Sequence, residues 1–209
     1  MIVADTEFTG LNPGKCGLWQ IGALELENPG NAFLEESRID DDDEVEPAAL
    51  KVVEKTEAEI RDNSKQSQKQ MLKNFFDWSS KIKVKNLICH GPWDFAFLLI
   101  KAKKYNLDFP FPHRMFDTHS IAQIKYFENY KKFLIEEDKS AMNLGSVLQF
   151  CGIPDNRRIV EIGGKTSKQG EPHNALEDTK LTAEAFSRLA YGKNLLQDYA
   201  QFKIPGYLK

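Results

Sequence analysis

Residues 2–10 read IVADTEFTG, a short apolar run that leads into two carboxylates and a glycine-bearing turn. Side chains two apart on a strand point to the same face, so Asp5 and Glu7 are expected to project together near the strand's end. Ligand sites of α/β sheets lie at the carboxyl ends of strands, and hard divalent metals take oxygen ligands. Taken alone, however, the pair is more typical of two solvated surface acids.

The composition is that of one globular domain. The 209 residues are 41% apolar and 28% charged, which excludes disordered and fibrous classes. No stretch approaches the roughly 18 apolar residues of a membrane span, and no basic leader precedes an apolar run, so we expect no membrane association. Cys16, Cys89 and Cys151 lack CxxC spacing. They argue against disulfides and a zinc site, and favour a reducing compartment, the cytoplasm.

The net charge of −3 depends on one acidic run, Asp40–Glu44, which holds five of the 31 acids. Without this run, 28 basic residues face 26 acidic ones. The run predicts a solvated loop, since it lacks the glycine and closing glutamate of a calcium-binding loop. The charge therefore neither excludes nor supports a nucleic-acid partner.

The hydrophobic pattern predicts a strand meander followed by alternating helices and strands, which makes the class mixed α/β. Strands are expected at 2–5, 19–27, 32–39, 83–89 and 114–116, with a turn at 28–31, and helices at 66–81, 95–105, 119–127, 144–151 and 174–190. We predict one domain over 1–209, with an insertion at 127–142, a mobile loop at 155–172 and a tail at 192–209. Thr56 and Glu59 form a candidate capping box.

Two further groups carry chemistry. Asp94 follows the 83–89 strand in HGPWD and begins an apolar helix, where the plain interpretation is an N-cap. His173 precedes the last helix, and Asp178 lies one turn inside it. Neighbouring parallel strands would bring Asp94 close to the first two acids, and histidine titrates near neutral pH. Four acids and a histidine at such positions are hard to assign to chance.

These residues resemble a known family. DTEFTGL at 5–11, HGPWDFAFL at 90–98 and HNALEDTKLTA at 173–183 are similar to the three motifs of the DEDDh (DnaQ-like) 3′–5′ exonucleases, in order and in spacing. The similarity extends to residues 116–118 and to the 144–152 helix. It implies a ribonuclease-H-like fold with a central five-stranded mixed β-sheet flanked by helices.

The resemblance also implies the chemistry. Asp5, Glu7, Asp94 and Asp178 would hold two Mg²⁺ or Mn²⁺ ions, and His173 would activate the attacking water. Two metals about 3.5–4 Å apart stabilise the attacking and leaving oxygens of a phosphoryl displacement. The substrates would be single-stranded DNA or RNA 3′ ends, and the products nucleoside 5′-monophosphates.

Substrate contacts are expected in the turn after the first motif and on the second-motif helix. The expected residues are Phe8, Thr9, Gly10, Leu11 and Phe97. Leu11 would wedge against the last base, and Phe97 would stack on it unless it belongs to the core. The chain departs from the family at Gly91-Pro92, where Asn-Ala is more frequent, and at Phe8, where threonine is frequent. Both departures bear on substrate preference rather than on metal ligands.

Three alternatives stay open at this point. One is an RNA-specific exoribonuclease, of the oligoribonuclease or deadenylase kind. Another is a catalytically silent nucleic-acid- or protein-binding module on the same fold. The third is a domain that works as a homodimer or within a polymerase or repair assembly, for which Tyr199, Phe202 and Tyr207 in the tail could dock a partner.

Overall fold

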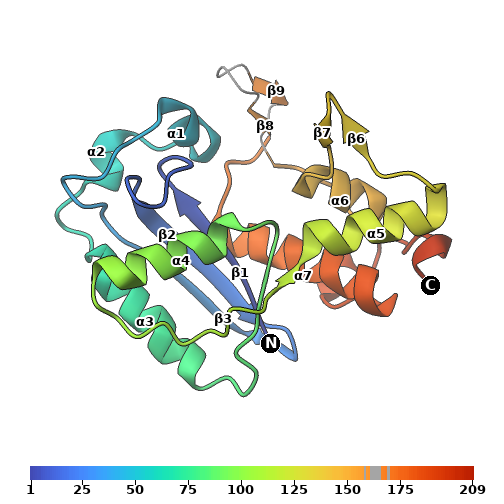
Figure 1. The fold of residues 1–209 in the computed structure, drawn as a ribbon, viewed down its shortest axis with the longest axis horizontal. Helices are drawn as coiled ribbons and strands as arrows, with labels where there is room; N and C mark the ends of the chain where they lie inside the picture. The colour runs from blue at the N-terminus through green and yellow to red at the C-terminus, as the bar shows by residue number, and fades with distance from the viewer. Residues whose placement is uncertain (158, 161–165, 169) are drawn as a thin grey trace.

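A computed structural model describes residues 1–157, 159–160, 166–168 and 170–209 (Figure 1). Its centre is a five-stranded sheet in the order β3-β2-β1-β4-β5. The strands are β1 Ile2–Phe8, β2 Leu18–Glu25, β3 Asn28–Glu36, β4 Leu87–Cys89 and β5 Phe116–Asp117. The first three pair antiparallel, whereas β4 pairs parallel with both β1 and β5. The predicted five-stranded mixed sheet is confirmed.

Helices cover both faces of this sheet. They are α1 Pro47–Val53, α2 Glu57–Ile60, α3 Gln68–Ser80, α4 Trp93–Lys104, α5 Thr118–Tyr130, α6 Leu144–Phe150 and α7 Ala175–Tyr191, with 3-10 turns at Gln197–Tyr199 and Gly206–Leu208. Two small hairpins pair β6 Ile135–Glu136 with β7 Lys139–Ser140, and β8 Ile159–Val160 with β9 Thr166–Lys168. The capping box of Thr56 and Glu59 is present at the start of α2.

The alternation of β1 assigns its two faces to different helices. Ile2 and Ala4 belong to a core cluster with side chains of α3 and α4, whereas Val3 packs with Ala183 and Phe186 of α7. The same period of two continues beyond Ala4. Asp5 and Glu7 therefore project toward α7, and Thr6 projects toward α4.

The turn between β2 and β3 was predicted wrongly at 28–31. The chain reverses at Leu26 and Glu27, and β3 already begins at Asn28. Leu26 is buried against the α7 side of the sheet, and its N–H donates to the carbonyl of Met1. The chain therefore reverses two residues before the start of the predicted turn. Pro29 is tolerated within β3 because β3 is an edge strand.

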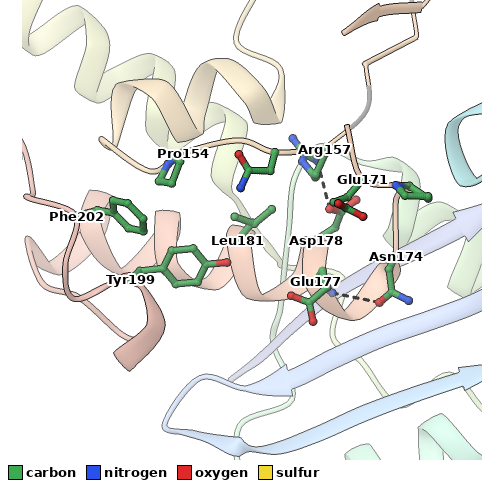
Figure 2. Close-up of a pocket in the computed structure, with 11 residues that line it drawn as sticks. Pro154, Arg157, Glu171, Asn174, Glu177, Asp178, Leu181, Tyr199 and Phe202 are labelled. Carbon is green, nitrogen blue, oxygen red and sulfur yellow. Dashed lines mark hydrogen bonds and ion pairs between the residues drawn. The ribbon is translucent and has the colours of Figure 1, made fainter. Parts of the chain in front are cut away.

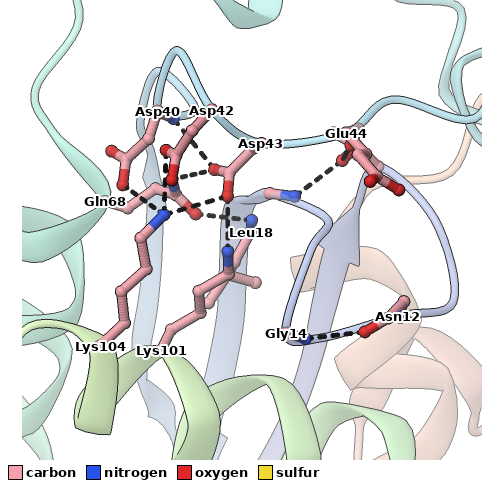
Figure 3. A network of polar contacts seen from close by, with 12 residues as sticks. Asn12, Gly14, Leu18, Asp40, Asp42, Asp43, Glu44, Gln68, Lys101 and Lys104 are labelled. Atoms are coloured by element: carbon pink, nitrogen blue, oxygen red, sulfur yellow. Dashed lines mark hydrogen bonds and ion pairs between the residues drawn. The ribbon is translucent and has the colours of Figure 1, made fainter.

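The acidic run is a loop, and Asp41, Asp42 and Glu44 are exposed as predicted, but Asp43 is not. Asp43 is only 4% exposed, and its carboxylate pairs with the Nζ of Lys101 at 2.8 Å (Figure 3). Lys101, which is 1% exposed, comes from α4. Lys101 makes this burial tolerable, because a buried carboxylate is stable where a partner neutralises it.

The C-terminal tail packs on its own domain. Ile204 and Leu208 join a core cluster with α5, α6 and α7, and the Tyr207 ring stacks on Phe150 at 4.9 Å. Tyr199 contacts the same cluster. In the segment predicted as an insertion, α5 extends to Tyr130 and the β6–β7 hairpin follows.

The loop predicted at 155–172 lies partly outside the described residues, and its described part contains the β8–β9 pair. The three cysteines are free and buried. Across the described ranges, no helix has the length and apolar character needed to cross a membrane.

Candidate active site

The start of α7 is held against β2 by a close approach at Gly22. A Cβ there would lie 2.2 Å from the carbonyl carbon of Ala175, so only glycine fits. The Ala175 N–H donates to Gln20 Oε1 at 2.8 Å, and the Thr179 hydroxyl donates to the Gly22 carbonyl at 2.9 Å. Asn174 caps the helix. These contacts place the first turn of α7 beside the end of β1.

Asp94 is oriented by β1 itself. Its Oδ1 accepts hydrogen bonds from the Thr6 N–H at 2.9 Å and the Thr6 hydroxyl at 2.8 Å. Gly91 adopts a φ of 82°, a left-handed turn between β4 and α4, and its N–H donates to Asp117. The N-cap of α4 is Pro92, so the N-cap interpretation of Asp94 was wrong. The carboxylate of Asp94 is instead bonded to Thr6 of β1.

One pocket of about 220 Å³ collects all five residues expected to be catalytic. Its lining consists of Asp5, Thr6, Glu7, Phe8, His90, Trp93, Asp94, Leu144, Arg157, His173 and Asp178. Ligand atoms of Glu7, His173 and Asp178 lie within 4.8 Å of one another, and His173 Nδ1 is 3.1 Å from Asp178 Oδ2. β1, α4 and α7, far apart in the sequence, thus deliver four carboxylates to one place, and the segment before α7 adds an imidazole.

Three carboxyl groups of this pocket, those of Asp5, Glu7 and Asp94, have raised pKa values. Burial raises the pKa of Asp5 well above its usual value, and the charges of Asp94, Asp178 and Glu7 raise it further. Burial, followed by the charges of Asp178 and Asp94, likewise raises the pKa of Glu7. Burial raises the pKa of Asp94 to about 7, although the hydrogen bonds from Thr6 act in the opposite direction. The cluster would therefore be stabilised by added positive charge.

Arg157 is a charged residue of this pocket that the sequence analysis missed. Its Nη1 lies 3.4 Å from Asp178 Oδ1 (Figure 2). Its Nε and Nη2 contact the two carboxylate oxygens of Asp155 at 3.0 and 3.1 Å. Its side chain is 12% exposed. Arg157 belongs to none of the three motifs, so only a long-range contact reveals its place.

The sequence model of the RNase_T exonuclease family matches residues 2–186. The chain belongs to this exonuclease family. The match spans β1 to α7 and so includes every element that lines the pocket. It confirms the resemblance to the DEDDh exonucleases and makes the chain a phosphodiester hydrolase by family. No curated protein sequence matches.

Solved nucleases share the fold of this exonuclease. The nuclease domain of 3'hExo, a DEDDh family member bound to rAMP, has a TM-score of 0.62 and 20% identity, over 98% of this chain and 94% of that one. Cell-death related nuclease 4 has a TM-score of 0.64 and 12% identity, over 92% and 64%. E. coli exonuclease I with a dT13 oligonucleotide has a TM-score of 0.66 and 14% identity, over 90% and 40%. The chain thus spans nearly all of the 3'hExo domain, but less than half of exonuclease I.

The residues of this exonuclease that were expected to contact substrate differ in how exposed they are. Phe97 is fully buried and stacks on Phe8, with ring centroids 4.3 Å apart, so it has no surface for a base, and the expected stacking by Phe97 is corrected. Thr9 is also buried, with its hydroxyl bonded to Glu44 and Gly17. Gly10 is buried, whereas Leu11 is 57% exposed and Phe8 lines the pocket.

The donor set of the pocket fits a hard divalent metal. It consists of carboxylate oxygens, with one imidazole, and it lacks thiolates among the described residues. Asp178 Oδ1 is buried and has no hydrogen-bond partner in the described part of the chain; its contact there is the 3.4 Å ion pair to Arg157. A buried carboxylate oxygen left in this way is an available ligand.

Proposed function

We propose that the chain is a metal-dependent 3′–5′ exonuclease that removes nucleoside 5′-monophosphates from single-stranded nucleic-acid 3′ ends. The observation that carries the proposal is the convergence of Asp5, Glu7, Asp94, Asp178 and His173 in one pocket. Family membership supports phosphodiester hydrolysis, and the arrangement supports the metal-assisted form of that reaction.

In this proposal the four carboxylates hold two divalent ions, Mg²⁺ or Mn²⁺. Bound there, the ions would supply positive charge that offsets the carboxylates and stabilises the phosphate during displacement. The raised pKa of Asp94 supports this role, because a carboxylate that resists ionisation in isolation gains from a cation beside it. Thr6 keeps the same carboxylate aimed at the pocket.

His173 is the proposed general base. It lies on the segment before α7, is 23% exposed, and reaches the pocket beside Asp178. Its imidazole takes the proton from a water molecule as that water attacks the terminal phosphodiester. The bond from phosphorus to the 3′ oxygen of the preceding nucleotide breaks, which leaves a shortened strand and a 5′-monophosphate.

The terminal nucleotide is proposed to contact Leu11 and the pocket-lining edge of Phe8. Leu11 is the exposed apolar side chain of the turn after β1, which suits contact with a base. DNA and RNA are both retained as substrates, since 3'hExo was solved with rAMP and exonuclease I with a DNA oligonucleotide.

The test incubates the protein with 5′-labelled single-stranded DNA and RNA of equal sequence, with Mg²⁺, with Mn²⁺ and with EDTA. We expect a ladder of products that shorten from the 3′ end with metal, and intact substrate with EDTA. A second label on the 3′ nucleotide should appear as mononucleotide. Shortening in EDTA, or products of 5′ origin, would overturn the proposal.

Two variants separate the roles. Asp5→Ala should lower activity by about a thousandfold or more, since removed metal ligation costs several kcal/mol at the transition state. His173→Ala should retain metal and oligonucleotide binding but turn over at least about a hundredfold more slowly. Full activity of Asp5→Ala would contradict the metal assignment, and lost metal binding in His173→Ala would contradict the general base.

A further inference from the structure

Arg157 makes two different kinds of contact. Nε and Nη2 pair with both oxygens of Asp155, in the side-by-side geometry that fixes a guanidinium firmly. Nη1 instead faces Asp178 Oδ1 at 3.4 Å, a longer contact that is an ion pair rather than a hydrogen bond. The arginine is thus held by Asp155, while its remaining edge meets a proposed metal ligand.

The backbone that carries Arg157 is tied to the segment that leads to His173. Arg157 and Glu171 form a bridge, and the Glu171 N–H donates to the Asn156 carbonyl at 2.9 Å. A Cβ on Gly170 would lie 2.4 Å from that carbonyl, so the two segments are in tight contact. The guanidinium therefore stays beside the catalytic pocket even when its contact to Asp178 is lost.

Space for the guanidinium exists on both of its sides. Arg157 lines the catalytic pocket, and it also lines a second pocket of about 260 Å³ (Figure 2). Asp178 is shared by both pockets, whereas Leu181, Tyr199 and Phe202 belong to the second one. The guanidinium therefore borders open space beside Asp178, and the Asp155 pair would keep it there if Asp178 were taken by another cation.

We propose that Arg157 pairs with the Asp178 carboxylate in the metal-free protein, and that it binds a phosphate group of the nucleic acid once Asp178 is a metal ligand. The inference rests on the proposed function. If Asp178 held a metal ion, Nη1 of Arg157 would lose this partner, and its N–H groups would be available to the pocket from the Asp155 anchor. A planar guanidinium matches the oxygens of a phosphate, and phosphoryl displacement builds negative charge that such a cation offsets.

The proposal predicts two effects of opposite sign for Arg157→Gln. Without nucleic acid, Mn²⁺ should bind more tightly by about tenfold, because a competing cation has been removed from Asp178. With Ca²⁺ present, a labelled oligonucleotide should bind about tenfold more weakly, because a charge-assisted hydrogen bond to phosphate is lost. A residue with a merely structural role would weaken both interactions together.

The experiment titrates Mn²⁺ calorimetrically into the EDTA-stripped, dialysed protein and measures oligonucleotide affinity by fluorescence anisotropy in Ca²⁺. A gel checks that the oligonucleotide stays intact. Arg157→Lys keeps the charge without the planar fork, so Mn²⁺ affinity should stay near that of the wild type while oligonucleotide affinity falls. If Arg157→Gln does not fold, Arg157→Lys still tests the contact with phosphate through oligonucleotide affinity. Lys180→Gln is the matched control, because Lys180 pairs with Glu177 on the same helix and should change neither affinity.

Unchanged Mn²⁺ affinity in Arg157→Gln, or unchanged oligonucleotide affinity in both Arg157 variants, would overturn the inference while leaving the proposed function intact. A wild-type protein that binds no Mn²⁺ and shortens no oligonucleotide would instead overturn the proposed function, and the inference with it. Tighter Mn²⁺ binding together with weaker oligonucleotide binding would support both.

Discussion

Two groups of carboxylates among the described residues are neutralised in different ways. Asp40, Asp42 and Asp43 meet the ammonium groups of Lys101 and Lys104 at 2.8 to 3.3 Å (Figure 3). The other group is the active-site cluster, defined as Asp5, Glu7, Asp94 and Asp178, where Asp178 pairs with Arg157 and contacts the imidazole of His173.

The difference separates a structural role from a chemical one. The first group, called the Asp40–Asp43 group, consists of Asp40, Asp42 and Asp43. Its two lysines come from α4, so the pairing joins the loop to a helix of the core. In the active-site cluster four carboxylates exceed the positive charge of their described partners, and burial raises the pKa of three of them. Such a surplus fits a site that takes its balancing charge from outside the chain.

The largest expected effect comes from removing Lys101, the buried one of the two cations that pair with Asp40, Asp42 and Asp43. Lys101→Met leaves Asp43 buried without its closest cation, which should lower the free energy of unfolding by about 3–5 kcal/mol. Urea denaturation measures the loss. Added Mg²⁺ should not restore stability, because this group is a structural one.

Two variants control this prediction. Asp42→Asn should change stability by no more than about 0.5 kcal/mol, since its side chain is 78% exposed. The double variant Lys101→Met with Asp43→Leu should recover much of the loss, because it removes the stranded charge. Recovery by Mg²⁺ in the single variant would break the distinction between the two groups.

A pH series tests the active-site cluster. The pKa of Asp94 is raised from the ordinary 3.8 to about 7, so its stabilising contribution is complete below about pH 4 and is lost as pH rises through 7. In EDTA we expect this group to make unfolding easier at pH 8 than at pH 5, by an amount on the order of a few kcal/mol.

Metal should remove this pH dependence. With saturating Mg²⁺ the ionised carboxylates gain a partner, and the thermal midpoint at pH 8 should rise toward or above its value at pH 5. Asp94→Asn should flatten the EDTA profile, because the group no longer titrates. Identical profiles for the wild type and Asp94→Asn in EDTA would show that the cluster is already neutralised by the chain.

The smallest expected effect concerns how the cluster is assembled. Gly22→Ala places a methyl group against the backbone of Ala175, an overpacking that should cost about 1–3 kcal/mol. It should also lower activity, because the turn of α7 that carries Asp178 must shift. Gly30→Ala is the matched control, since the nearest atom to its added Cβ is 3.8 Å away. Equal losses of stability and activity in both variants would show that the close approach at Gly22 does not position the active site.

Much of the fold was predictable because local patterns specify it. The strand period of β1, the apolar face of α3 and the three motifs were sufficient for the mixed sheet and the family, both of which are confirmed. The turn at Leu26–Glu27 was missed because Asn28-Pro29-Gly30 has stronger local turn chemistry. Burial of Leu26 against α7 outweighed that preference.

The candidate site divides in the same way. Asp5, Glu7, Asp94, His173 and Asp178 could be selected from the sequence, because each belongs to a motif of recognisable spacing. Phe97 was offered as a stacking residue, but the fold buries it under Phe8. An aromatic residue in an apolar helix looks the same in the sequence whether its face is covered or open.

The sequence by itself determined which side chains share a face and which motifs follow one another, because these depend on bonds between near neighbours. Only the tertiary structure decided how charge is balanced. Lys101 reaches Asp43 across 58 residues, and Arg157 reaches Asp178 from outside every motif. The Coulomb interaction depends on distance in space and on burial, and neither can be read from separation along the chain.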